Sequence, residues 1–363
     1  MMDIHQATKE YEAWAAERTR FLKQDLDLKH ERMKESPFMF FRATYYRWAQ
    51  LWPEECSACA KAPEVLGIGD LHIENFGTWR DADSRLAWGV NDFDEAYPLP
   101  YTNDLVRLAA SARLAVKEQN LGMTAREASA AILAGYNEGI QGNGQPFVLE
   151  EKHPVLRQAA MGELRDPPRF WEKMDSLPEV TGLVPDEVRA ALEEMLPEEG
   201  LKYRVAHRTA GLGSLGRERY VALGDWRGGK LAREAKALFE SAAVWASGAK
   251  SKGRILYQEL LDRSVRDVDP FVRLCGRWIV RRLAPHCSRI DIAALPKSRD
   301  EAHILHAMGF ETANIHHASA KAVADIRSDL KKRPEGWLHE AAKAMAKTVE
   351  KDWEDWNKGK KEV

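Results

Sequence analysis

Residues that bind protons and metal ions follow two apolar segments of the sequence. The stretch VLGIGDLHIENFGTW spans residues 65–79, and its run of small and branched apolar residues ends at Asp70. An aspartate, a histidine, a glutamate and an asparagine then occur within six positions. A second apolar segment, SRLAWGV, leads into Asp92 and Asp94 in NDFDEA. Oxygen ligands of this kind can hold a hard cation such as Mg²⁺, and a carboxylate can take a proton from a hydroxyl group.

The arrangement resembles the catalytic loop of kinase-like phosphotransferases, especially the aminoglycoside and choline kinase branch, in which the loop reads H-G-D-L-H-x-x-N. The resemblance implies that Asp70 is the catalytic base, which accepts the proton of the substrate hydroxyl. It implies that Asn75, five residues later, binds magnesium. Asp92, after the next strand, would hold the metal ion that bridges the ATP phosphates. Asp94 would either reach a second metal ion or cap the following turn.

The same residues have other interpretations. An acidic helix cap and turn would also produce D-x-x-x-x-N, but the preceding strand, His72 and the NDFD segment together favour a functional site. Ile68 replaces the leading histidine of the family, which removes a supporting group rather than a metal ligand. Asp70-x-His72 could also begin a metallophosphoesterase site, but the sequence lacks the later G-D and G-N-H motifs that this chemistry needs.

A glycine-rich segment lies later in the chain, between two alternating patterns. GLGSLG, residues 211–216, has the spacing G-x-G-x-x-G, and RERYVAL after it alternates as a strand does. A dinucleotide-binding fold would place a helix there, whereas the glycine loop that covers ATP in kinases joins two strands. An ordinary hairpin turn explains the motif equally well. The residues predicted to cover the phosphates are Gly211, Gly213, Ser214 and Gly216.

The elements that would position these residues predict an α+β fold. We expect a helix over 8–35, strands at PEVLGI and SRLAWGV, and helices over 103–119, 124–140 and much of 149–198. From about residue 201 the sequence alternates and turns on glycine, as antiparallel strands do. GRILYQELL and FVRLCGRWIVRRLA are strand candidates, and five strands with one helix fit this part. The chain is expected to be helical again from residue 299.

The order of these elements predicts a circular permutation, because only 69 residues precede Asp70. The predicted fold is a protein-kinase-like two-lobed fold with a mostly helical large lobe and a small antiparallel five-stranded lobe. Residues 1–200 would form the first part of the large lobe, with the catalytic and metal-binding loops. Residues 201–288 would form the small nucleotide-binding lobe, and residues 289–363 the closing helices of the large lobe.

The order of motifs also looks like the bacterial domain of unknown function 2252 family, from about residue 30 to residue 357. The motifs are SPFMFFRATYYRWA, GIGDLHIENFGTW, NDFDEAYPLPYTNDLVRLAASARLA, GLGSLGRERYVAL, LAREAKAL and GRWIVRRLAPHCSRIDIAAL. The third small-lobe strand of that family commonly reads L-Q-V-K-E-A, and its lysine would be the partner of the ATP phosphates. Arg233 takes that position here. Lys230 and Lys236, three residues away on either side, would face the opposite side of the strand. Glu240, on the following helix, would either pair with the phosphate-binding cation or be solvated.

Several other residues are expected to support the site. Asp104 resembles an aspartate that follows the metal-binding loop in small-molecule kinases, and we expect it to cap a helix and brace the loop. His316 and His317 match a family histidine on the helix that should pack under the catalytic loop, and we expect a histidine in the core or one that supports the site residues rather than a catalytic one. Trp79, Tyr97 and Tyr101 are expected near the substrate.

Composition limits the possible partners. Lys and Arg number 54 against 56 Asp and Glu, so the net charge of −2 provides no strong field for nucleic acid or an anionic membrane. A small-molecule substrate is therefore predicted. No run of eighteen apolar residues and no signal peptide is recognisable, which predicts a cytoplasmic protein. Cys56 and Cys59 form C-x-x-C without a second ligand pair nearby, so we expect no zinc site.

Together, the sequence predicts a Mg-ATP-dependent phosphotransferase that acts on a hydroxyl group of a small molecule. Two alternatives stay open. Arg233 in place of lysine is also consistent with a nucleotide-binding pseudokinase that acts as a regulatory protein. A kinase-like nucleotidyl (AMP) transferase would use the same metal ligands, with the nucleotide bound in the reverse direction.

Overall fold

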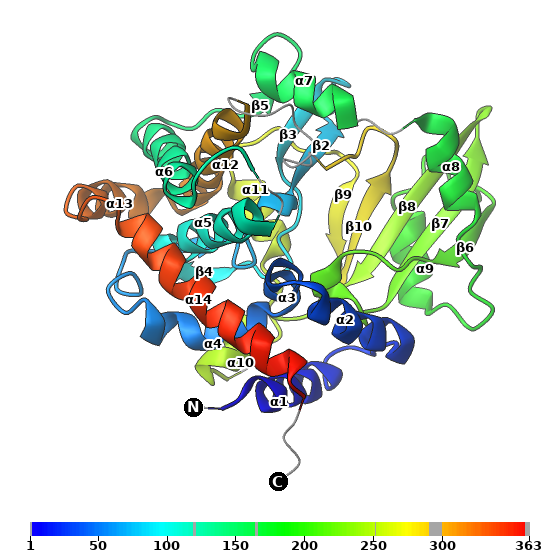
Figure 1. The fold of residues 1–363 in the computed structure, drawn as a ribbon. Helices are drawn as coiled ribbons and strands as arrows, with labels where there is room; N and C mark the ends of the chain where they lie inside the picture. Colours follow the sequence, from blue (N-terminus) through cyan, green and yellow to red (C-terminus); the bar gives the residue numbers. More distant parts are fainter. Residues whose placement is uncertain (1, 119–120, 164–165, 251, 290–299, 360–363) are drawn as a thin grey trace.

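The chain forms an α+β fold, as predicted, and about half of it is helical (Figure 1). The structure is a computed structural model that describes residues 2–118, 121–163, 166–250, 252–289 and 300–359. The helices are α1 (Ile4–Ala16), α2 (Lys23–Glu35), α3 (Pro37–Ala43), α4 (Tyr45–Glu55), α5 (Tyr101–Glu118), α6 (Ala125–Gln141), α7 (Pro154–Glu163), α8 (Pro167–Asp175), α9 (Asp186–Glu193), α10 (Ala242–Ser247), α11 (Tyr257–Arg263), α12 (Asp300–His316), α13 (Val323–Leu330) and α14 (Trp337–Asn357). The 3₁₀ helices are η1 (Ile73–Asn75), η2 (Leu212–Ser214) and η4 (His317–Ala322).

Three antiparallel sheets complete the fold. The strands are β1 (Glu64–Gly67), β2 (Phe76–Arg80), β3 (Leu86–Val90), β4 (Tyr97–Pro100), β5 (Phe147–Val148), β6 (Tyr203–His207), β7 (Arg219–Trp226), β8 (Gly229–Ala237), β9 (Val272–Cys275) and β10 (Trp278–Leu283). They pair as β1-β4, β2-β3-β5 and β6-β7-β8-β10-β9. The predicted strands at PEVLGI and SRLAWGV correspond to β1 and β3, whereas β2, directly after the first loop, was not predicted.

The five-stranded antiparallel sheet confirms the strand count predicted for residues 201–288, although one strand assignment was wrong. GRILYQELL contains helix α11, because Tyr257, Leu260 and Leu261 form one buried face at helical spacing. FVRLCGRWIVRRLA forms two strands, β9 and β10, with Gly276 in the left-handed region (φ 58°) between them. The part of the last family motif from residue 290 onward lies outside the described residues.

The two faces of this sheet meet different surroundings (Figure 1). One face packs on α9 through Val188 and Leu192, against Ala235 and Val280. The other face packs on α8 at its outer end, and Ile279 on that same face joins the main core. Because side chains alternate along a strand, neighbouring residues of β8 point into these two different environments.

The single helix predicted over residues 8–35 is two helices, α1 and α2. The backbone N–H of Leu22 donates to Gly216 O at 2.7 Å, and Phe21 forms an isolated β-bridge with Arg217. These contacts bind the segment between the helices to the glycine-rich segment, so a tertiary contact interrupts the helical pattern.

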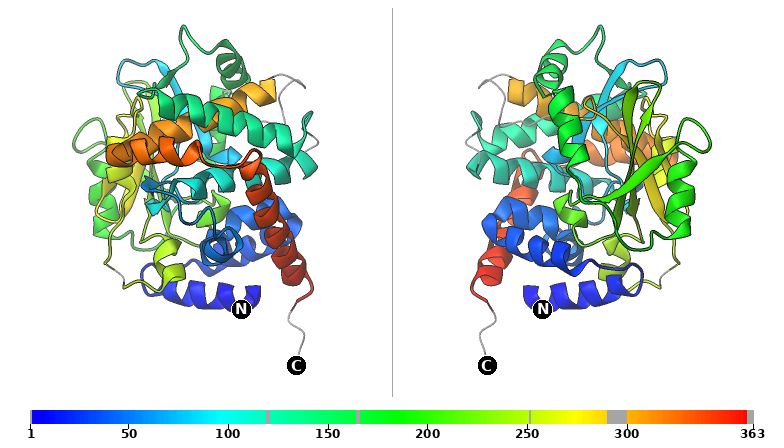
Figure 2. Two further views of the ribbon diagram at one scale, coloured as in Figure 1. Left: turned by 90° about the vertical axis from the view of Figure 1, so that its left-hand side faces the viewer. Right: turned by 90° about the vertical axis from the view of Figure 1, so that its right-hand side faces the viewer.

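The helical part of the fold is built around α5, α6, α12 and α14. Helices α6 and α12 approach closely, since a Cβ atom at Gly135 would lie 1.8 Å from His306 O, and one at Gly309 would lie 1.9 Å from Ile132 O. Helices α1 and α14 lie side by side near the two termini (Figure 2), where the ring of His5 stacks on Trp356.

Replacing Gly309 with alanine should destabilise the fold, because the added methyl group forces α6 and α12 apart. We expect the free energy of unfolding, measured by urea denaturation, to fall by about 2–3 kcal/mol. Gly162→Ala is the matched control, since no atom of the described residues outside its own stretch of helix lies within 4 Å of the added Cβ, and it should leave stability unchanged or slightly raised. An unchanged Gly309→Ala protein would contradict the close packing of these helices.

Candidate functional site

An open cavity of about 200 Å³ lies where the loops after β1 and β3 meet the glycine-rich segment of the five-stranded sheet. Its walls therefore come from parts of the chain that are more than a hundred residues apart. The sequence-predicted site residues that line it are Asp70, Asn75, Asp92, Asp94, Gly211, Gly213 and Ser214.

The loop after β1 is fixed by a buried carboxylate. Asp104 is fully buried on α5, and its two oxygens accept the backbone N–H groups of Ile68 (2.7 Å) and Gly69 (2.9 Å). His316 also donates Nε2–H to Asp104, at 3.0 Å, and its Nδ1 lies 2.9 Å from Tyr136 Oη. Asp104 thus braces the loop as predicted, but it acts on the loop backbone rather than as a helix cap, and His316 is a core residue.

A glycine allows the loop to turn close to its neighbours. Gly69 has φ 81°, and a Cβ atom there would lie 2.5 Å from Glu95 O and 2.8 Å from Tyr45 Oη. Since other residues rarely adopt this backbone conformation, Gly69 determines the direction in which the next residue, Asp70, enters the cavity.

Asp70 is held by an arginine that sequence reasoning missed. Arg107 is fully buried on α5 and donates Nε–H to Asp70 Oδ1 at 2.9 Å, with a second short contact from Nη2. The guanidinium lies 4.0 Å from the ring centre of Phe41. Burial raises the pKa of Asp70 above its usual value, while Arg107 opposes the rise. The sequence did contain a signal for this role, because Arg107 is a charged residue within the apolar face of NDLVRLAASARLA.

Asn75 lies in the 3₁₀ turn η1, where its side chain takes part in a local cap. Its Oδ1 accepts the backbone N–H of His72 at 2.7 Å, and His72 Nδ1 accepts the N–H of Glu74 at 3.2 Å. Burial and nearby arginines hold the pKa of His72 well below its usual value. The amide of Asn75 therefore reaches the cavity with its oxygen already in one hydrogen bond.

Asp92 and Asp94 share a cation from the five-stranded sheet. Lys236 Nζ, on β8, lies 2.6 Å from Asp94 Oδ1 and 3.3 Å from Asp92 Oδ2. Burial and the charge of Asp92 raise the pKa of Asp94. Burial acts to raise the pKa of Asp92, but the pKa is lowered because Lys236, hydrogen bonds with Asp94 and the charge of Arg281 together outweigh burial. The lysine thus joins the sheet to the loop after β3.

The glycine-rich segment connects β6 to β7 and closes over Asp70. A Cβ atom at Gly213 would lie 3.4 Å from Asp70 Oδ2 and 3.1 Å from Arg42 O. Lys29 of α2 donates to Gly213 O at 3.3 Å, which holds the segment in place. Gly216 (φ 94°) does not line the cavity, because it faces Phe21 and Leu26.

Two predicted residues lie away from the cavity. Arg233 is on the α9 side of β8, where its guanidinium donates to Met195 O and lies 4.4 Å from the ring centre of Phe271. Glu240 precedes α10 rather than lying on a helix, and its carboxylate accepts the N–H groups of Lys252 and Gly253 at 2.7 Å each.

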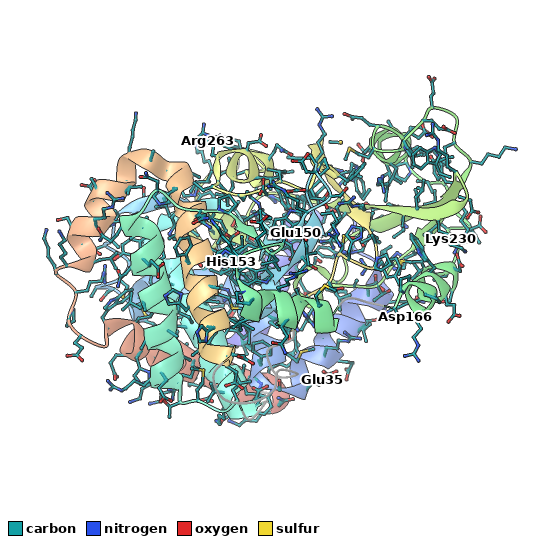
Figure 3. The ribbon with its side chains drawn as sticks, turned by 90° about the horizontal axis from the view of Figure 1, so that it is seen from above. Glu35, Glu150, His153, Asp166, Lys230 and Arg263 are labelled. Carbon is teal, nitrogen blue, oxygen red and sulfur yellow. The ribbon has the colours of Figure 1, made fainter. Side chains whose placement is uncertain are left out.

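Of the two lysines three residues from Arg233, the structure places buried Lys236 behind the cavity wall, in contact with Asp92 and Asp94, and Lys230 away from it. Lys230 pairs with Asp175 at the outer end of the sheet, where Figure 3 labels it. The predicted alternation of side chains along β8 therefore determines which cation reaches Asp92 and Asp94, since Lys236 and Arg233 point to opposite faces of the sheet.

Other cavity residues were not predicted from the sequence. Arg217 is buried, and it pairs with Glu95 (3.2 Å) and Asp94 (3.6 Å). Tyr101 and Trp79, which were expected near the substrate, are not among the residues that line this cavity. The Tyr101 hydroxyl donates to Asp329, and Trp79 lines a neighbouring cavity.

The donors in the cavity fit a magnesium ion that arrives with phosphates. Among the described residues, no three His, Cys, Asp or Glu side chains form a complete metal site, and Cys56 and Cys59 are free thiols. Asp92, Asp94 and Asn75 offer hard oxygen donors. Mg²⁺ commonly uses one or two carboxylates and takes its other ligands from phosphates and water. The resemblance to kinase-like catalytic loops implied this donor set, and the fold brings all three residues to one cavity.

Removing the Asp104 carboxylate should disorganise the loop after β1. Asp104→Ala leaves the N–H groups of Ile68 and Gly69 without an acceptor, so we expect a loss of about 2–4 kcal/mol in the free energy of unfolding. Asp83→Ala, an exposed turn variant, is the control and should change stability by less than about 0.5 kcal/mol. Comparable small effects in both proteins would show that the loop does not depend on Asp104.

Comparisons with known proteins give one match. Searches of curated proteins and of solved structures found no significant match. No helix in the described part of the chain has the length and apolar character needed to cross a membrane. Residues 20–163 match the model of a family described as "Uncharacterized protein conserved in bacteria (DUF2252)", and this segment contains Asp70, Asn75, Asp92 and Asp94 but not the glycine-rich segment or the five-stranded sheet.

Proposed function

We propose that the protein is a Mg-ATP-dependent phosphotransferase that acts on a hydroxyl group of a small molecule. The observation that carries the proposal is the contact of Lys236 with Asp92 and Asp94. It sets a buried cation from the sheet behind the predicted metal-binding acids, which line one cavity together with Asp70 and the glycine-rich segment. Phosphoryl transfer needs cations and hard oxygen ligands in this combination, with a carboxylate near the attacking hydroxyl.

The proposed reaction assigns a role to each side chain. The acceptor oxygen forms a bond to the γ-phosphorus, the bond between that phosphorus and ADP breaks, and the hydroxyl proton passes to Asp70. Arg107 holds one oxygen of Asp70, so the other is left toward the cavity. Lys236 and the backbone N–H groups near Gly213 would bind phosphate oxygens. Magnesium, when bound, supplies charge neutralisation on the phosphates, and Asp92, Asp94 and Asn75 would hold it.

The arrangement of elements supports a circularly permuted, kinase-like, two-lobed fold as part of this proposal. The five-stranded sheet follows the Asp70 loop in the chain, yet its glycine-rich segment lines the same cavity, and Lys236 contacts the cavity acids Asp92 and Asp94. The adjacent positions of α1 and α14 are consistent with a permuted order of elements.

A nucleotide-binding protein that does not transfer phosphate is the second candidate. It is favoured by the hydrogen bonds that already engage Asp70 Oδ1 and Asn75 Oδ1 within the protein. In that case nucleotide binding would be retained, and Asp70→Asn would have no chemical consequence.

Calorimetry with ATP, in the presence and absence of magnesium, tests the nucleotide site. We expect Lys236→Met and Asp92→Asn each to weaken Mg-ATP binding at least tenfold, because each removes a charge beside the phosphates. Arg233→Met is the matched control on the same strand, and binding should be unchanged since Arg233 faces α9. Loss of binding in Arg233→Met alone would overturn the assignment of Lys236.

Transfer is tested with γ-labelled ATP and a panel of hydroxylated small molecules. Asp70→Asn should retain Mg-ATP binding but reduce transfer by about a hundredfold or more, which is typical for loss of a general base. Mass spectrometry of the product separates the alternatives: added phosphate supports the proposal, whereas added AMP would replace it with nucleotidyl transfer. Nucleotide binding without any product would favour the second candidate.

A further inference from the structure

A second cavity of about 160 Å³ adjoins the first. It lies between β2, the loop after β3, α11, the start of β9 and the end of β10. Asn91, Arg281 and Arg289 line both cavities, so the two spaces share a wall. Tyr257 and Leu283 are among the side chains that give it an apolar surface.

The second cavity has an excess of positive charge. The described residues that line it include five arginines, Arg208, Arg266, Arg281, Arg282 and Arg289, but one acid, Asp269. Asp269 pairs with Arg282 at 3.1 Å. Buried Glu234, behind the wall, pairs with both Arg208 and Arg281, and also with Arg219. The single carboxylate of Glu234 therefore forms ion pairs with three guanidinium groups.

Arg266 has the least satisfied guanidinium in this wall. Its Nη2 donates to Val90 O at 2.8 Å, but Nε and Nη1 are buried and without a hydrogen-bond partner. The group lies 4.7 Å from the ring centre of Trp79 and 5.1 Å from that of Phe93, which fixes its position. Buried N–H groups of a cation are costly to leave unpaired, so a partner is expected at this place.

We propose that the second cavity binds the anionic group of the phosphate acceptor, which is therefore a hydroxylated small molecule that carries a phosphate or carboxylate. The role as acceptor rests on the proposed function, whereas the anion site rests on the arginines themselves. An acceptor held by Arg266 and its neighbours would extend past the shared wall and present its hydroxyl to the first cavity. The apolar side chains would contact its carbon skeleton.

Phenyl phosphate is a suitable probe, because it joins an anion to an apolar ring and has no hydroxyl on carbon to phosphorylate. We expect calorimetry to detect its binding to the parent protein, both alone and with a saturating non-hydrolysable ATP analogue and magnesium. Neutral benzamide should not bind. Arg266→Met should weaken phenyl phosphate binding at least tenfold, and Arg266→Lys should restore part of it. Arg263→Met, an exposed variant on α11 labelled in Figure 3, is the control and should bind as the parent does.

Each contrary result has a separate meaning, and the competition experiment needs no variant that could misfold. If the ATP analogue displaces phenyl phosphate, the second cavity belongs to the nucleotide site and the inference is overturned. If the parent binds ATP but not phenyl phosphate, the inference fails while the proposed function stands. If the parent binds phenyl phosphate but never binds ATP, the anion site stands and the acceptor role falls with the proposed function.

Discussion

The buried carboxylate of Asp104 is the constraint on which the candidate site depends. Backbone N–H groups cannot be left unpaired in a core, and the end of β1 has two that turn inward, at Ile68 and Gly69. Asp104 accepts both, and Arg107, almost one turn later on the same helix, holds Asp70. One helix therefore fixes both the backbone of the loop and the orientation of its acidic side chain. His316 connects the same carboxylate to α12, so the loop is tied to the centre of the helical core.

The charges in the first cavity are paired across elements rather than within them. Lys236 comes from the sheet and its acids from the loop after β3, while Arg217 reaches Glu95 from the glycine-rich segment. Removing one partner of such a buried pair costs more than the pair itself contributes, because an uncompensated charge stays behind. The contacts thus join the sheet to the helical part at the place where a ligand would enter.

Local patterns predicted the strands beside the cavity better than they predicted the long-range contacts that hold the loops. Apolar runs predicted β1 and β3, and the alternation of side chains along a strand predicted that Lys236 and Arg233 face opposite sides of β8. The short apolar segment that contains Leu260 was ambiguous, because strand and helix patterns overlap over so few residues. The sequence could not predict that Arg107 contacts Asp70 or that His316 contacts Asp104, since these pairs lie 37 and 212 positions apart in the chain.

The different charge of the two cavities follows from where their acids lie. In the first, Asp70, Asp92 and Asp94 face the open space, so a polyanion would enter together with a metal ion or beside the existing cations. In the second, Glu234 lies behind the arginines with no exposed surface, and Arg266 has two N–H groups without partners. A ligand there meets guanidinium groups first. The shared wall at Arg281 thus separates the space that we propose for phosphates with magnesium from the one that we propose for a simple anion.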